Sequence, residues 1–208
     1  MTRYSAEPDE HWEAAGERLL IHPIRPADAA EYNAFFRRLS PEDIRLRFFA
    51  AVRELTPAQL DKFTRLDYDR DMALIAVREE TGETVGVARL VREDDPLVAE
   101  FAVIVQHDLQ GRGLATHMMQ RLLDWAPPHG VREVVGEILA ANVAMIDLAR
   151  HLGFHLRHLP EDRQIIEARL SLAPPPPRSL ANDPIVGYGS SIQKDESHER
   201  CARERRSE

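Results

Sequence analysis

The segment from Val98 to Val105 holds one carboxylate, that of Glu100, in an otherwise apolar run of residues. Side chains alternate between the two faces of a strand, so Glu100 is expected to share a face with Ala102 and Ile104. A carboxylate with apolar neighbours tends to have a raised pKa, which suits a general base. Glu100 is therefore our candidate catalytic residue. The alternative is a solvent-exposed glutamate at the start of a strand, or one that pairs with an arginine.

A glycine-containing turn follows and joins this strand directly to the start of a helix. A helix N-terminus presents unpaired N–H groups and the positive end of the helix dipole, which together favour a phosphate group. A Walker loop is excluded because no Gly-Lys-Ser/Thr follows, and a Rossmann fingerprint fails because its third glycine is missing. Arg112 can add positive charge and Thr116 a hydroxyl. The predicted phosphate-binding residues are Gln110, Gly111, Arg112, Gly113, Leu114, Ala115 and Thr116.

Strands and helices must hold these two features in place. Ser40 before Pro41 and Thr56 before Pro57 are typical helix starts, so two or three helices are expected within residues 27–66. Leu114, Met118, Leu122 and Trp125 recur at helical spacing. Asn142 is a candidate cap for a short helix over residues 143–152. Apolar runs predict strands over residues 19–24, 72–77, 84–91, 98–106, 131–139, 154–159 and 164–172.

The chain has 208 residues, enough for one buried core of ordinary domain size. We divide it into a polar leader (1–18), a folded domain (19–172) and a proline-rich linker with a disordered charged tail (173–208). The formal net charge of −8 argues against nucleic-acid binding. No apolar run approaches the ~20 residues of a membrane-spanning helix, and the first residues lack the apolar centre of a signal peptide. We therefore expect a cytoplasmic protein without membrane contact.

Two motifs resemble those of the GNAT superfamily of acyl-CoA-dependent N-acyltransferases. The pyrophosphate motif Q/R-x-x-G-x-G/A is matched from Gln110 to Ala115, and an Asn opening a helix that ends in Leu-Gly-Phe is matched from Asn142 to Phe154. The resemblance covers the whole predicted domain, residues 19–172. It implies an α/β (α+β) fold, with a central mixed, mostly antiparallel sheet of about six to seven strands flanked by helices. It also implies acetyl-CoA as cosubstrate.

A narrower resemblance links the segments RLRFFAAVRELTPAQLDKFTRLDYDRDMALIAV and AEFAVIVQHDLQGRGLA to the GNAT domains of bacterial Pat-type protein lysine acetyltransferases and of NDP-forming acyl-CoA synthetases. It implies acetyl transfer to a protein lysine, with Glu100 as the general base. Free lysine has a pKa of about 10.4, so a base is needed at neutral pH. Two alternatives stay open: a small-molecule amine acetyltransferase, and an acyl-CoA-sensing module without turnover. We expect a monomer or homodimer and no metal.

Substrate binding is expected to use the backbone of residues 101–105, in particular Phe101, Val103 and Val105, where an amide could polarise the thioester carbonyl as an oxyanion hole does. The resemblance implies that Asn142 contacts the pantetheine arm, although capping a helix is an equal alternative. Many GNAT enzymes place a tyrosine seven residues after this asparagine to protonate the leaving thiolate. Here that position is Ala149, so the usual general acid is absent, which keeps the sensing module open.

Overall fold

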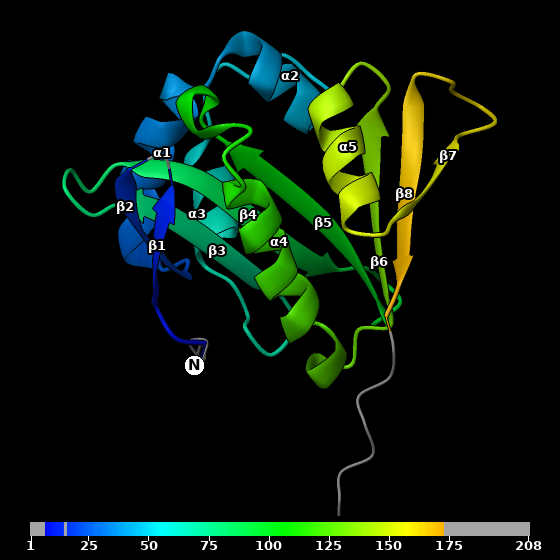
Figure 1. Ribbon diagram of the computed structural model, residues 1–208, viewed down its shortest axis with the longest axis horizontal. Coiled ribbons are helices and arrows are strands. Elements are labelled where there is room, and N and C mark those ends of the chain that lie inside the picture. The colour runs from blue at the N-terminus through cyan, green and yellow to red at the C-terminus, as the bar shows by residue number, and fades with distance from the viewer. Residues whose placement is uncertain (1–6, 15, 173–208) are drawn as a thin grey trace, which may run out of the picture. The chain divides into compact units, whose positions relative to one another are not determined.

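The computed structural model describes residues 7–14 and 16–172 (Figure 1). One sheet of eight strands runs through this part of the chain in the order β1-β2-β3-β4-β5-β6-β8-β7. Every neighbouring pair is antiparallel except β5 and β6, which are parallel. The strands are β1 Glu10–Ala14, β2 Glu17–Pro23, β3 Met72–Arg78, β4 Thr84–Arg92, β5 Val98–Val105, β6 Glu133–Leu139, β7 His155–His158 and β8 Ile165–Ser171. The predicted mixed, mostly antiparallel sheet is confirmed, with eight strands in place of about six to seven.

Helices cover both faces of the sheet (Figure 1). They are α1 Ala29–Arg38, α2 Pro41–Phe48, α3 Pro57–Thr64, α4 Leu114–Trp125 and α5 Val143–His151. Gly86 of β4 shows which face of the sheet α4 covers, because a Cβ atom at Gly86 would lie 3.3 Å from Leu114 Cδ2 and 3.5 Å from Met118 Sδ of α4. Arg89, three residues further along β4, donates to the Phe63 carbonyl of α3 at 3.0 Å. Since odd steps along a strand change its face, α3 and α4 lie on opposite faces.

Local capping explains where the helices of the first half begin. The Ser40 hydroxyl accepts a hydrogen bond from the Asp43 amide at 3.0 Å, and Pro41 occupies the first turn of α2. At α3, Thr56 and Gln59 form a reciprocal capping box, in which the Thr56 amide donates to Gln59 Oε1 at 2.9 Å. Each cap satisfies amides that have no intrahelical partner. Both helix starts were predicted from these residue types.

The sheet begins earlier in the sequence than predicted. Strand β1 and the first residues of β2 lie in the segment assigned to a polar leader, and β1 pairs with β2 from Glu10↔Ile21 to Ala14↔Glu17. Trp12 of β1 stacks on His117 of α4, with ring centroids 5.4 Å apart. Glu10 Oε2 lies 3.0 Å from Arg121 Nη1. Strand β1 is short and polar and is stabilised by these contacts with α4. The periodicity of the sequence does not reveal such contacts. The predicted linker and tail (173–208) lie outside the described residues.

The parallel strands β5 and β6 part after a short contact. They pair only from Val98↔Glu133 to Glu100↔Val135. Beyond that point β5 stays with β4 up to Gly86↔Val105, while β6 stays with β8 up to Leu139↔Ile165. The two strands therefore diverge as a V, which is visible between the labels β5 and β6 in Figure 1. The V opens a gap in the hydrogen-bonded sheet.

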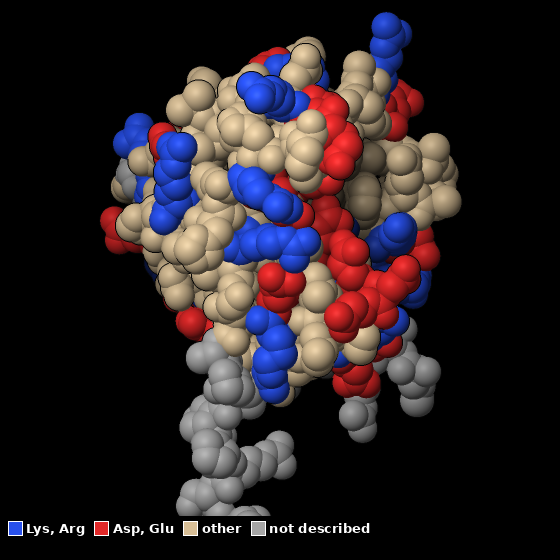
Figure 2. Space-filling view, turned by 90° about the vertical axis from the view of Figure 1, so that its right-hand side faces the viewer, with Lys and Arg blue, Asp and Glu red and all other residues tan. Residues whose placement is uncertain are grey.

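Two features of the described surface concern possible partners. No helix in the described ranges is long and apolar enough to cross a membrane. Figure 2 shows acidic and basic side chains interspersed over one side of the molecule. Within the described residues, Arg169 forms ion pairs with Glu133 and Glu167, each at 2.9 Å. A surface of this kind differs from the continuous basic patch that binds nucleic-acid phosphates.

Candidate functional site

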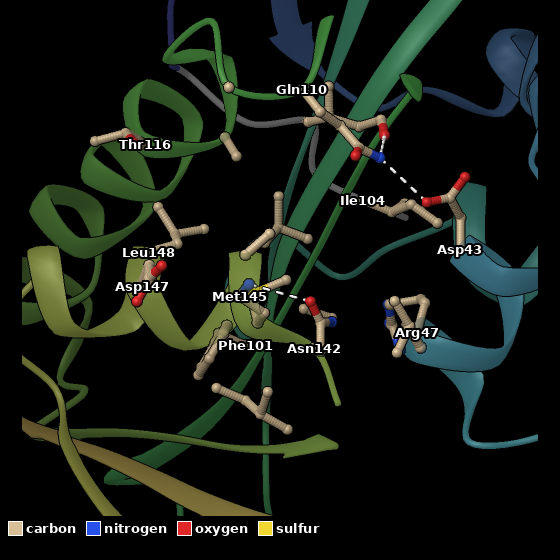
Figure 3. A pocket seen from close by; sticks show the side chains of 18 of the residues that line it. Asp43, Arg47, Phe101, Ile104, Gln110, Thr116, Asn142, Met145, Asp147 and Leu148 are labelled. Atoms are coloured by element: carbon tan, nitrogen blue, oxygen red, sulfur yellow. Dashed lines mark hydrogen bonds between the residues drawn. The ribbon is translucent and has the colours of Figure 1, made fainter. Parts of the chain in front are cut away.

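A cavity of about 580 Å³ occupies the gap between β5 and β6 (Figure 3). Residues of α2 line it on one face of the sheet, and residues of α4 and α5 line it on the other. The cavity therefore connects both faces through the V. It brings together most of the predicted site residues, namely Glu100, Phe101, Val103, Val105, Gln110, Gly111, Gly113, Ala115, Thr116 and Asn142.

Backbone groups of β5 are directed into this gap. The amide of Gln106, just after β5, donates to Val85 of β4 at 2.8 Å. Backbone groups of a paired antiparallel strand alternate in direction, so those of Phe101, Val103 and Val105 point away from β4 and toward the gap. The Val105 carbonyl accepts from Gln110 Nε2 at 3.0 Å. The Phe101 N–H still belongs to the last parallel pair with β6, Glu100↔Val135, so the N–H groups of Val103 and Val105 are the ones open to an extended ligand between the strands.

The turn before α4 has the form of an anion cradle. Gly111 and Gly113 both have positive φ, 70° and 90°. The first hydrogen bond of α4 runs from the His117 amide to the Gly113 carbonyl, at 2.9 Å. The amides of residues 114–116 come before it and therefore have no acceptor within the helix. A Cβ atom on Gly113 would have Trp12 as its nearest neighbour, at 3.9 Å, so the approach to the backbone is open. Unpaired amides at a helix N-terminus favour a phosphate group.

Two residues of the predicted cradle lie elsewhere. Arg112 is exposed and does not line the cavity. Leu114 is 0% exposed, with its side chain in the core under α4. Only the backbone amide of Leu114 remains available to the cradle. The spacing of the motif predicted both residues, whereas the direction of each side chain depends on the packing of α4 against the sheet.

Gln110 closes the end of the cavity with its side chain. Its Nε2 donates both to Val105 and to Asp43 Oδ1 of α2, at 3.1 Å for the latter (Figure 3). The amide group is thus occupied by protein contacts rather than directed at the cradle. This arrangement ties the turn to both β5 and α2. It fixes the position of the following glycines.

Glu100 lies where the two strands begin to part. Val105 and Gly86 are cross-strand partners. A Cβ atom on Gly86 would lie 3.4 Å from Val105 Cγ2 and close to Leu114 and Met118 of α4, so both residues project from the α4 face. Glu100 is an odd number of residues from Val105 and so projects from the α2 face. Partial burial raises the pKa of Glu100; the positive charge of Arg47 opposes this, and the negative charges of Glu93 and Glu137 add to it. The shift is in the direction that favours proton acceptance by this carboxylate.

Helix α5 contributes the remaining wall. Asn142 Oδ1 accepts from the Met145 amide at 3.1 Å, so the capping interpretation is confirmed, while the residue also lines the cavity (Figure 3). Ala149 is 1% exposed and is not among the lining residues, whereas His151, two residues later, is. Sequence reasoning missed His151 and also Arg47 of α2. Both line the cavity through helix positions that only the tertiary structure defines.

Comparison with known proteins shows what the chain is similar to. A family model described as acetyltransferase (GNAT) domain matches residues 18–155. The chain is 35% identical over 174 residues to an acetyltransferase of Pseudomonas aeruginosa, covering 81% of this chain and 94% of that protein. It is 30% identical over 139 residues to acetyltransferase Pat of Mycolicibacterium smegmatis, covering 66% of this chain and 41% of Pat.

Solved structures have the same fold. The GNAT domain of S. lividans PAT covers 82% of this chain with a TM-score of 0.74 and 24% identity, over 100% of that domain. The acetyltransferase yncA of Salmonella typhimurium, solved with its cofactor acetyl-CoA, covers 79% of this chain with a TM-score of 0.61 and 21% identity, over 98% of that chain. Within the described residues no three His, Cys, Asp or Glu side chains are grouped to hold a metal ion. The divided sheet, the cradle before α4 and the matching family model together assign this chain to the GNAT family of acetyltransferases.

Proposed function

We propose that this chain transfers the acetyl group of acetyl-CoA to a primary amine, with Glu100 as the general base and a protein lysine as the acceptor. The observation that carries the proposal is the cavity between β5 and β6, with Glu100 on the α2 face and the cradle at the start of α4. The two substrates would enter from opposite faces of the sheet. They would meet where the strands part.

The residues present fit acetyl-CoA. The open glycine backbone at Gly111 and Gly113 and the first amides of α4 would hold its pyrophosphate. The N–H groups of Val103 and Val105 would bind the pantetheine arm and the thioester carbonyl. Acetyl-CoA supplies an acetyl group activated as a thioester. The acetyl-CoA of the Salmonella typhimurium structure supports this assignment.

Glu100 would take the proton of the acceptor amine. Its raised pKa brings the carboxylate closer to the basicity that proton abstraction at neutral pH needs. Glu137, which lines the cavity, and Glu93 place further negative charge near Glu100 and favour the approach of an ammonium group. Loss of the proton to Glu100 leaves the amine lone pair free to attack the carbonyl carbon.

No side chain at the position of the usual general acid can protonate the leaving thiolate of coenzyme A. Ala149 has no proton to give and is buried. A thiol with a pKa of about 8.5 leaves readily as the thiolate, so in this proposal solvent supplies the proton. A GNAT domain without a general acid at this position can then still catalyse the transfer. Ala149 therefore does not by itself favour the acyl-CoA-sensing alternative.

A protein lysine is proposed as acceptor because acetyltransferase Pat is among the relatives and because the acidic groups near Glu100 suit a cationic side chain. The test is mass spectrometry of acetyllysine after incubating the chain, or its Glu100→Gln variant, with acetyl-CoA and a deacetylated cell extract. Sites that appear only with the unchanged chain would establish the function. Acetylation of free amines alone would favour the small-molecule alternative, and coenzyme binding without any transfer would favour the sensing module.

A further inference from the structure

Helix α2 contributes an arginine to the same cavity. Asp43 and Arg47 are four residues apart, so they lie on one face of α2, and both line the cavity (Figure 3). Asp43 contacts Gln110 at the cradle end. Arg47 lies one turn further along, close enough to Glu100 that each charge shifts the pKa of the other group. Arg47 therefore belongs to the acceptor end of the cavity.

The Arg47 guanidinium is half-buried and has no anionic partner within the described residues. Its central carbon lies 4.9 Å from the centroid of the Phe48 ring, a stacking contact that leaves the N–H donors free. No hydrogen bond or ion pair within residues 7–14 and 16–172 involves these donors. Glu100 is thus near but not within ion-pair distance. A guanidinium has five donors in a fixed fork, and a half-buried one without a partner is costly.

A second guanidinium, that of Arg89, lies near Arg47. Burial lowers the pKa of Arg47, Arg89 adds to the effect, and Tyr32 and Glu100 oppose it. Arg89 is itself 7% exposed, lies 4.7 Å from the Phe63 ring centroid and donates to the Phe63 carbonyl, which is neutral. Two guanidinium groups therefore lie on the Glu100 side of the cavity, while Glu93 and Glu137 add negative charge around Glu100 itself. The donors of Arg47, which no carboxylate of the described residues contacts, leave a place for one anion beside Arg47.

We propose that Arg47 is a specificity residue that binds a carboxylate of the acceptor, so that the preferred acceptors are amines with a carboxylate close to the reacting nitrogen. Glu100 and Arg47 would then contact opposite charges of one acceptor. The inference rests on the proposed function of this cavity. The carboxylate has two sources: the carboxylate of a free α-amino acid, or an Asp or Glu side chain beside a target lysine. The planar fork of arginine binds either one with two parallel hydrogen bonds.

The experiment measures acetyl transfer to matched acceptor pairs at saturating acetyl-CoA. One arm compares the free α-amino acids with their α-carboxamides. The other compares lysine peptides that have Glu on both sides of the lysine with peptides that have Gln there. For each pair the result is the ratio of kcat/KM for the carboxylate acceptor to that for the neutral acceptor. This ratio cancels any change in the pKa of Glu100, because such a change affects both acceptors alike.

We expect a ratio of about 10 to 100 in one arm, which is the range for a charge-assisted hydrogen bond in a partly buried site. The arm that gives this ratio identifies whether the carboxylate belongs to a free α-amino acid or to a side chain beside a target lysine. Arg47→Gln should reduce the ratio to about 1 without changing the Kd of acetyl-CoA. The matched control is Arg45→Gln on the same helix, whose side chain is 46% exposed and pairs with Glu42. Arg45→Gln should keep the ratio. Ratios near 1 in both arms, or a ratio that survives Arg47→Gln, would overturn the inference.

Failure of the proposed function has a different signature, since no acceptor in either arm would be acetylated. Binding then decides the role of Arg47. N-acetylglycine and N-acetylglycinamide would be titrated into the chain by NMR in the presence of coenzyme A. Stronger binding of N-acetylglycine that is lost in Arg47→Gln would support the carboxylate site. Equal binding of the two probes would overturn it.

Discussion

Replacing Gly136 with alanine tests whether the divergence of β5 and β6 depends on one aromatic ring. A Cβ atom at Gly136 would lie 2.5 Å from Phe101 Cε1 and 2.8 Å from Phe101 Cδ1, which is closer than such atoms can approach. The Phe101 ring has little freedom to retreat, because it is 7% exposed and its centroid lies 4.9 Å from that of Phe154. The added methyl group must therefore displace the ring, the strands, or both.

The expected cost follows from overpacking of a core, about 1–3 kcal/mol. For a domain of this size each kcal/mol lowers Tm by about 2–4 °C, so Gly136→Ala should lower Tm by about 2–12 °C. A displaced Phe101 also shifts the backbone of β5 up to the Val103 amide, which faces the gap, so the Kd for acetyl-CoA should rise by about tenfold, equivalent to one hydrogen bond of about 1.4 kcal/mol.

Differential scanning calorimetry and isothermal titration calorimetry measure the two effects. Gly86→Ala is a matched control, because its Cβ would lie 3.3 Å from Leu114 Cδ2, a contact that a small side-chain shift relieves. The double variant Phe101→Leu with Gly136→Ala should recover part of both losses, since leucine vacates the space of the ring edge. An unchanged Tm and Kd in Gly136→Ala, or a double variant that is no better than the single one, would refute the steric argument.

Further predictions concern three variants of residues in the site. Glu100→Gln should lower kcat by about 10²–10⁴-fold while the Kd of acetyl-CoA stays within a factor of two, and stopped assays beside calorimetry would show this. The raised pKa of Glu100 implies that kcat/KM falls as pH drops through that pKa, and this limb should be lost in Glu100→Gln. A carboxyl group whose pKa is raised in the folded chain destabilises the folded state as pH rises through that pKa, because the ionised form is less favourable there than in the unfolded chain. Glu100→Gln removes this ionisation. The variant should therefore unfold in urea at pH 7 with at least the unfolding free energy of the unchanged chain. Gly113→Glu should abolish acetyl-CoA binding, because a residue other than glycine is strained at φ 90° and a carboxylate repels phosphate; retained affinity would remove the cradle. Asn142→Ala should cost about 0.5–2 kcal/mol of unfolding free energy through loss of the cap to Met145, and an unchanged unfolding midpoint would contradict that role.

Local rules predicted much of the fold. The caps at Ser40, Thr56 and Asn142 depend on side chains that accept from amides three residues further along the chain, so the local sequence contains the whole interaction. The alternation along β5 was also predicted, and Ala99 and Phe101 are buried while Glu100 between them is exposed. Period-two patterning is a property of the strand itself.

Other features depend on contacts between distant parts of the chain. Arg47 lines the cavity because α2 packs beside β5, a neighbour more than fifty residues away, and nothing in the local pattern of α2 distinguishes it from the exposed Arg45. The close contact between Phe101 and Gly136 joins positions that are 35 residues apart in the sequence. Motif spacing assigned Arg112 to the cradle, but the structure directs it to solvent.

The position of β1 has a consequence for solubility. Without β1, strand β2 would have an unpaired outer edge beside Leu19 and Ile21, two residues of the core, and could add a strand from another molecule. With β1 in place, the outer edge is only five residues long and carries Glu10 and Glu13. Short, charged edge strands discourage intermolecular pairing. Removal of the first sixteen residues should therefore promote aggregation, even though none of the described residues in this segment lines the cavity.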